Sequence, residues 1–247
     1  MASIIDIKRR KASVESTGQI TKAMKLVSTV KLQRAKQRAD ESKAYFNKMY
    51  ETISSILAKA GNINHPYLQE NGSTKKGIIT ISSNRGLAGG YNNNIVKLIR
   101  DSGMNKEDIM IYAVGHKAMD TLKHRGYEIV SDDSEMINEP VYDDARILGE
   151  KLLKAFEDGE IGEIYLAYTD FKNTVVHEPK LVKLLPIEND QQANEEKSES
   201  KAPMNFEPEP EKALSLLFQG AERSSFFINS KVYLQHDLWS LSYICSK

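Results

Sequence analysis

The sequence has 247 residues, and its 34 Lys and Arg residues balance its 34 Asp and Glu residues. A hydrophobic content of 40%, without an apolar run near the ~20 residues that cross a bilayer, is typical of a soluble protein with a core. A single cysteine, Cys245, excludes an internal disulfide and a cysteine-based metal cluster. Residues 1–10 lack the layout of a signal peptide, which favours a cytoplasmic protein that is not exported.

Residues 4–59 contain no proline and only one glycine, Gly18, and they predict one long helix of roughly 80 Å. Apolar residues recur at alternating steps of three and four, which is the seam of a coiled coil. A slip in this pattern near residues 31–34 is expected to change the supercoil locally without ending the helix. The seam positions are Ile20, Ala23, Val27 and Val30, followed by Ala39, Ser42, Phe46, Met49, Ile53, Ile56 and Ala60.

The chain is basic up to about residue 60, and the balancing acid lies further on, notably at residues 188–211. A narrow apolar seam flanked by Lys and Arg needs a partner helix, in this chain or another, and the charge split suggests an acidic partner. Three interpretations compete: a core-packing helix with a solvated basic face, a nucleic-acid-binding helix, and a shaft for a protein partner. The basic stretch lacks aromatic residues, which argues against nucleic acid.

The middle of the chain alternates strands with helices, which predicts a Rossmann-like open sheet and an α/β fold class. Thr169 and Asp170 are expected to close the fourth strand, and Pro186 the fifth. The predicted strands are residues 77–82, 109–114, 127–130, 161–168 and 174–185, and the predicted helices are residues 92–100, 116–125 and 142–157.

A glycine-rich turn at residues 84–90 separates the first strand from the next helix, where a phosphate can bind. It lacks the Gly-Lys-Ser/Thr ending of a P-loop and the spaced glycines of a dinucleotide site, so a tight backbone turn is the favoured interpretation. The five histidines show no metal-ligand spacing, and the Asp132-Asp133 and Asp143-Asp144 pairs are interpreted as turn and N-cap residues. No catalytic, cofactor-binding or metal-binding residue is therefore assigned.

The chain divides into a long coiled-coil helix (1–62), a Rossmann-like domain (63–187), a flexible acidic loop (188–210) and a last segment (211–247). In the last segment a helix begins at residues 211–217. Beyond Leu217, aromatic residues, serines and charges alternate without a sustained helical seam.

Several ordered motifs resemble the gamma subunit of the rotary, proton-driven ATP synthase, over Met1 to about Leu217. They are residues 7–10 (IKRR), 19–27 (QITKAMKLV), 31–35 (KLQRA), 82–92 (SSNRGLAGGYN), 168–174 (YTDFKNT), 184–186 (LLP) and 206–210 (FEPEP).

The resemblance implies a non-catalytic central stalk, without cofactor, that couples proton flow through the c-ring to ATP synthesis by rotation. Family members pair their N- and C-terminal helices as an antiparallel coiled coil inside the hexamer of alpha and beta subunits. Their Rossmann-like domain lies at the base, beside the epsilon subunit and the c-ring. The expected location is the cytoplasmic face of the bacterial membrane, peripheral through the complex. Torque would pass through packing and through the basic helix acting against acidic loops of the beta subunits.

The resemblance also implies the residues that contact partners. Those expected in coupling are Arg9, Arg10, Lys22, Met24, Lys25, Val27 and Arg85, with Phe206 and Glu207 at the c-ring or epsilon. Beyond Leu217 the family's C-terminal helix is not recognisable, so we expect a missing or atypical partner helix and an impaired rotor. The alternatives are a basic coiled-coil protein that binds nucleic acid and a Rossmann-type nucleotide-binding enzyme.

Overall fold

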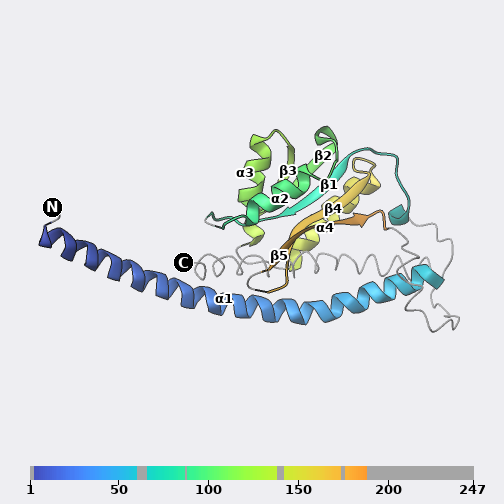
Figure 1. Ribbon diagram of the computed structural model, residues 1–247. Helices are drawn as coiled ribbons and strands as arrows, with labels where there is room; N and C mark the ends of the chain where they lie inside the picture. The colour runs from blue at the N-terminus through green and yellow to red at the C-terminus, as the bar shows by residue number, and fades with distance from the viewer. Residues whose placement is uncertain (1–2, 60–65, 87, 138–141, 174–175, 188–247) are drawn as a thin grey trace.

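The computed structural model describes residues 3–59, 66–86, 88–137, 142–173 and 176–187, which form one long helix and a sheet domain (Figure 1). The predicted acidic loop (188–210) and the predicted last segment (211–247) lie outside the described residues. Among the described helices, none combines the length and the apolar character that crossing a membrane requires.

Helix α1 (Ile4–Lys59) is a single helix of 56 residues that curves gently along its length (Figure 1). It runs unbroken through Gly18 and through the predicted slip near Lys31. The hydroxyls of Thr17, Thr21 and Thr29 each donate to the carbonyl four residues before them, so these side chains bond within the helix. The single long helix is confirmed with its predicted bounds, whereas the side chains of the downstream seam positions are not described.

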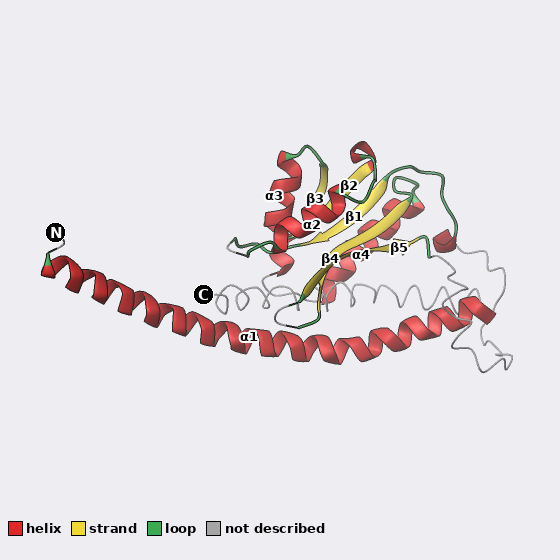
Figure 2. Ribbon diagram, in the orientation of Figure 1, coloured by secondary structure: helices red, strands yellow, loops and turns green. Residues whose placement is uncertain are grey.

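The sheet has five strands in the order β3-β2-β1-β4-β5, and its β1, β2, β3 and β4 run parallel (Figure 2). Strand β5 is antiparallel to β4, because the five residues that join them, 172–176, are too few for a crossover helix. The strands are β1 (Lys76–Ile81), β2 (Ile109–Val114), β3 (Glu128–Asp132), β4 (Glu163–Phe171) and β5 (His177–Leu185).

Helices cover both faces of this sheet, α2 (Tyr91–Arg100) and α3 (His116–His124) on one and α4 (Tyr142–Glu157) on the other (Figure 2). Successive side chains of β1 pack alternately against the two helical layers, since side chains along a strand point to opposite faces of the sheet. Ile78 lies in the cluster with Ile95 of α2, and Ile79 lies in the cluster with Leu152 of α4. The predicted α/β open sheet is therefore confirmed.

The predicted end of the fourth strand is wrong, because β4 continues through Thr169 and Asp170 to Phe171. Thr169 is buried there, and the Asp170 carboxylate lies 2.7 Å from Lys180 Nζ on the adjacent strand β5. Polar residues that suggest a turn are thus accommodated within the hairpin by a cross-strand ion pair.

Tyr67, in the 3₁₀ turn Pro66–Leu68 that precedes β1, contacts both the segment after β5 and the end of α4. Its carbonyl accepts a hydrogen bond of 3.0 Å from the N–H of Ile187, just after β5. Its hydroxyl donates to Glu157 Oε1 of α4 at 2.7 Å, and its ring meets the Phe156 ring edge-on. Burial and the contact with the Glu157 carboxylate raise the pKa of Tyr67, so this hydroxyl stays protonated as a donor.

Glu163 is held between two lysines from the strands on either side of it. Its carboxylate lies 2.8 Å from Lys76 Nζ of β1 and 3.0 Å from Lys183 Nζ of β5. Burial alone would raise the pKa of Glu163, but the hydrogen bonds and charges of the two ammonium groups outweigh it. They lower that pKa from 4.5 to about 2.

We expect the sheet domain to lose stability in acid through this carboxylate. Because the pKa of Glu163 is depressed in the folded state, its contribution is fully present above pH 4.5 and is lost as the pH falls toward 2. Glu163→Gln should therefore cost about 2 kcal/mol of unfolding free energy at pH 7 and less than half of that at pH 3. Pulse-labelling hydrogen exchange of the β4 peptide across a urea titration measures this in the full chain.

The control is Glu70→Gln, which removes the same charge at an exposed position outside the strands. It should leave the urea midpoint of β4 unchanged at both pH values. An equal loss at pH 7 and pH 3 for Glu163→Gln would contradict an ionic origin of the stabilisation.

Candidate functional site

Helix α1 exposes an apolar stripe, whereas the large apolar residues exposed in the described part of the sheet domain, Ile147 and Val176, lie apart, in α4 and just before β5. Ile20 and Val27 are each 59% exposed, Met24 is 56% exposed and Leu26 is 64% exposed. On a helix, residues 20, 24 and 27 share one face, so these side chains form a continuous surface. We call Ile20, Met24 and Val27 the shaft patch. Large apolar side chains gathered in this way mark a surface that another molecule covers.

The basic residues predicted for coupling lie on the same helix. The side chains of Arg9, Arg10, Lys22 and Lys25 are exposed, and among the described residues they form no ion pair. The structure thus places six of the predicted site residues on one continuous helix. The charges of the four basic ones are available to a partner. Phe206 and Glu207 lie outside the described residues.

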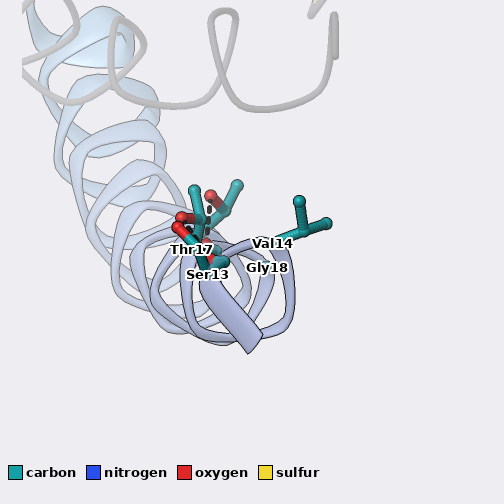
Figure 3. Close-up of a pocket in the computed structure, with 5 residues that line it drawn as sticks. Ser13, Val14, Thr17 and Gly18 are labelled. Atoms are coloured by element: carbon teal, nitrogen blue, oxygen red, sulfur yellow. Dashed lines mark hydrogen bonds between the residues drawn. The ribbon is translucent and has the colours of Figure 1, made fainter. Parts of the chain in front are cut away.

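A shallow depression of about 410 Å³ interrupts the surface of α1 upstream of the shaft patch (Figure 3). It is lined by Ser13, Val14, Thr17, Gly18 and Thr21, and two of the lining hydroxyls already donate to helix carbonyls. Figure 3 shows Val14 pointing away from the Ser13 and Thr17 side chains. Since none of the described residues that line it is charged, this depression suits close approach of another backbone rather than binding of a polar ligand.

The remaining predicted site residue, Arg85, lies in the loop that joins β1 to α2, far from α1 in sequence. Its side chain is exposed, while the residues before it are partly or fully buried. Ser83 Oγ donates a hydrogen bond of 2.7 Å to the Arg85 carbonyl. The Asn92 side chain accepts from the Ser83 N–H at 3.0 Å and donates to Ser83 Oγ at 3.0 Å.

Asn84 extends this network to two other loops at the same edge of the sheet. Its Nδ2 donates to the Ser134 carbonyl at 2.7 Å, and its Oδ1 accepts from the His116 N–H at 3.1 Å. Ser134 follows β3 and His116 follows β2, so Asn84 joins the carboxyl ends of three parallel strands. Nothing in the spacing of the sequence predicts this role, since a lone Asn in a glycine-rich turn is ordinary turn chemistry.

The first amides of α3 are all used within the chain. The N–H groups of His116, Lys117 and Ala118 donate to Asn84 Oδ1, the Ser83 carbonyl and Ser82 Oγ, respectively. A phosphate binds at a helix N-terminus through such N–H groups, which are occupied here. The glycine-rich segment itself precedes α2, where the Tyr91 N–H donates to the Ala88 carbonyl at 3.1 Å, as in a tight turn.

Asp132 accepts a turn hydrogen bond as interpreted, whereas the N-cap interpretation of Asp143 and Asp144 is wrong, because α4 already begins at Tyr142. Asp132 Oδ1 accepts from the Ser134 N–H at 3.1 Å, and its other oxygen lies 3.6 Å from His116 Nδ1. Asp143 and Asp144 lie in the first turn of α4, where a negative charge is favourable. Among the described residues, no three His, Cys, Asp or Glu side chains gather as they would around a metal ion.

Comparisons with known proteins agree on one family. The family model described as ATP synthase matches residues 3–228, which extends past Leu217. The chain is 54% identical over 238 residues to the ATP synthase gamma chain of Lachnoclostridium phytofermentans, covering 94% of this chain and 80% of that one. It is 33% identical over 246 residues to the sodium ion specific gamma chain of Acetobacterium woodii, with the same coverage.

Two solved structures share the fold. The central stalk and c-ring structure of the Tetrahymena thermophila mitochondrial ATP synthase matches with a TM-score of 0.60 and 19% identity, covering 92% of this chain and 97% of that chain. The rotor of the Euglena gracilis mitochondrial ATP synthase matches with a TM-score of 0.58 and 16% identity, covering 97% and 88%. One long helix beside a sheet domain is thus an arrangement that known rotors also have.

Proposed function

This chain belongs to the ATP synthase gamma-chain family, and from that premise we propose how its described residues couple rotation to catalysis. It is a non-catalytic subunit of the ATP synthase, the rotor of a complex devoted to ATP synthesis and ion transport. In our proposal, residues 1–62 act as the shaft inside the hexamer of alpha and beta subunits. Residues 63–187 act as the base, beside the epsilon subunit and the c-ring.

The observation that carries this proposal is the exposed shaft patch on α1. Fully burying a side chain such as Ile or Val stabilises by about 1.5–3 kcal/mol, so the three residues of the patch favour a covered state. Because Ile20, Met24 and Val27 are each more than half exposed, α1 gains stability from an enclosing partner. The ring of alpha and beta subunits is the enclosure that we propose.

Charge supports the same assignment. Arg9, Arg10, Lys22 and Lys25 keep their charges available among the described residues, and acidic loops of the beta subunits would complement them. Such contacts act at a rotating interface through long-range attraction more than through fixed geometry. Neither a nucleotide-binding enzyme nor a nucleic-acid-binding protein is favoured by the family to which the chain belongs.

The remaining partners follow from the same proposal. Phe206 and Glu207 would contact the c-ring or the epsilon subunit at the foot of the shaft. The complex would hold this chain at the cytoplasmic face of a bacterial membrane, peripheral to the bilayer. Arg85 would contact an acidic surface of the catalytic hexamer from the loop after β1.

Co-expression of this chain with the alpha, beta and epsilon subunits tests the proposal. We expect a complex that co-purifies through a tag on this chain and hydrolyses ATP. In membranes that also contain the c-ring, Lys22→Gln with Lys25→Gln should lower ATP-driven proton pumping several-fold while ATP hydrolysis persists. The physical reason is that removing two cations weakens the contact that transmits torque.

The control for this test is Lys97→Gln with Lys123→Gln, which removes two exposed cations from α2 and α3. That pair should pump as the unchanged chain does. A chain that stays alone when all the subunits are present would refute the assignment as a shaft. Equal pumping by both double variants would refute the role of Lys22 and Lys25.

A further inference from the structure

We propose that Asn84 is a positioning residue, which holds Arg85 in place for its contact with an acidic surface of the catalytic hexamer. This inference rests on the proposed function, since it takes from there the role of Arg85. It assigns a role to Asn84, which is not among the predicted site residues, and explains how hydrogen bonds of the sheet domain fix the backbone before Arg85.

The loop that carries Arg85 contains little to stiffen it from its own sequence. Gly86, Gly89 and Gly90 follow Arg85 within five positions, and Gly89 has a φ of 51°. Glycines widen the range of backbone conformations that an unpinned loop can visit. Arg85 itself has a long side chain with large rotamer freedom, so its reach is defined only if its backbone is fixed.

Two sets of hydrogen bonds supply that fixation. The Arg85 carbonyl accepts from Ser83 Oγ at 2.7 Å, and Ser83 is 7% exposed and itself bonded to Asn92 of α2. Asn84, the residue in between, is bonded through both ends of its amide to the loops after β2 and β3. Arg85 is therefore preceded by two residues whose side chains are bound to three different segments of the domain.

A second cation lies beside this loop. A Cβ placed on Gly86 would lie 3.8 Å from Lys117 Cε, so the stem of Lys117 lies next to Gly86. Lys117 belongs to the first turn of α3, which Asn84 also anchors through the His116 N–H. Asn84 thus fixes the relative position of the two segments that carry the exposed cations Arg85 and Lys117. Together these cations form a surface that complements carboxylates. Preorganising such a surface lowers the ordering cost of each contact.

A double-mutant cycle on the assembled, membrane-bound complex tests this inference. The readout is ATP-driven proton pumping per ATP hydrolysed, for Arg85→Ala, Asn84→Ala and the combined variant. We expect Arg85→Ala to lower this ratio about five-fold, because one charge-assisted contact is lost. We expect Asn84→Ala to lower it about two- to three-fold, because the same contact is only loosened. The combined variant should equal Arg85→Ala alone, because Asn84 acts only through Arg85.

The control is Asn71→Ala. The Asn71 amide Nδ2 donates at 2.7 Å to the carbonyls of Phe156 and Ile161, and its Oδ1 accepts from the Ser73 N–H at 3.2 Å, so this variant breaks three hydrogen bonds of a loop Asn in the same domain. It should leave the pumping ratio unchanged. If Asn84→Ala does not assemble, Asn84→Asp replaces it, since the carboxylate still accepts from the His116 N–H and lacks the donor for the Ser134 carbonyl.

Each outcome separates this inference from the proposed function. An unchanged ratio for Arg85→Ala refutes the contact of Arg85 and removes the role of Asn84 with it. A lowered ratio for Arg85→Ala with an unchanged ratio for Asn84→Ala overturns the positioning role alone. An additive loss in the combined variant, or an equal loss for Asn71→Ala, shows that Asn84 acts through the stability of the domain and likewise overturns it.

Discussion

Replacing Gly115 with alanine is expected to lower the unfolding free energy of the sheet domain by about 3–5 kcal/mol. Gly115 has a φ of 117°, a conformation that residues with a Cβ rarely adopt. A Cβ built there would lie 2.2 Å from the Ser82 carbonyl oxygen and 2.6 Å from the Ser82 carbonyl carbon. Because those atoms belong to backbone, neither can move aside as the end of a flexible side chain would.

The effect should spread beyond one turn, since Ser82 joins β1 to β2. The Ser82 N–H donates to the Val114 carbonyl at 2.8 Å, and Ser82 Oγ donates to the Gly115 carbonyl at 3.0 Å. Displacing Ser82 loosens the last bonds between two central strands and the cap of α3. Hydrogen exchange of the β1 and β2 peptides in the full chain measures the loss, because their slowest amides report domain unfolding.

Gly149→Ala is the matched control for this prediction. Gly149 lies inside α4, and a Cβ there would meet nothing within 4 Å. Alanine favours a helix over glycine by roughly 1 kcal/mol, so this change should leave exchange unchanged or slower. If the peptides of Gly115→Ala exchanged like those of Gly149→Ala, the close approach of Gly115 to the Ser82 backbone would not exist as described.

Most of the fold was predictable because it depends on local patterns. The absence of proline predicts the length of α1, and runs of Ile and Val predict strands whose bounds agree to within about three residues. The end of β4 was missed because it depends on Asp170 pairing with Lys180 across a hairpin, which no local pattern encodes. The ion pairs of the half-buried Glu163 carboxylate were missed for the same reason, since its two lysines come from different strands.

The candidate site was predictable only in part. Periodicity predicts Ile20 and Val27 as seam positions, whereas the family resemblance supplies the coupling roles of the α1 cations, of Met24 and of Arg85. Asn84 was missed because its importance depends on which loops the sheet topology brings together. The consecutive Ser-Asn-Arg before the glycines does not indicate which groups the Asn84 side chain bonds. The strand order β3-β2-β1 places Ser134 and His116 beside it. Long-range hydrogen bonds of this kind are read from a fold and not from spacing.

Replacing both Ile20 and Val27 with aspartate is expected to abolish assembly of this chain with the alpha and beta subunits. Each of these side chains is 59% exposed, so the variant chain should fold with the same helix and sheet. In the complex the shaft patch becomes covered, and two carboxylates would then be buried without partners. An uncompensated buried charge costs several kcal/mol, so the yield of co-purified complex should fall by more than about ten-fold.

Thr29→Asp with Gln33→Asp separates the position of the new charges from their number. This pair also adds two carboxylates to exposed neutral residues of α1, and a step of about 100° per residue places both on the side opposite Ile20 and Val27. Charges that remain at a solvated or polar surface cost less than about 1 kcal/mol, so this variant should still assemble. Equal loss in both variants would mean that net charge, and not the shaft patch, governs assembly. Full assembly of the Ile20 and Val27 variant would remove the observation on which the shaft assignment depends.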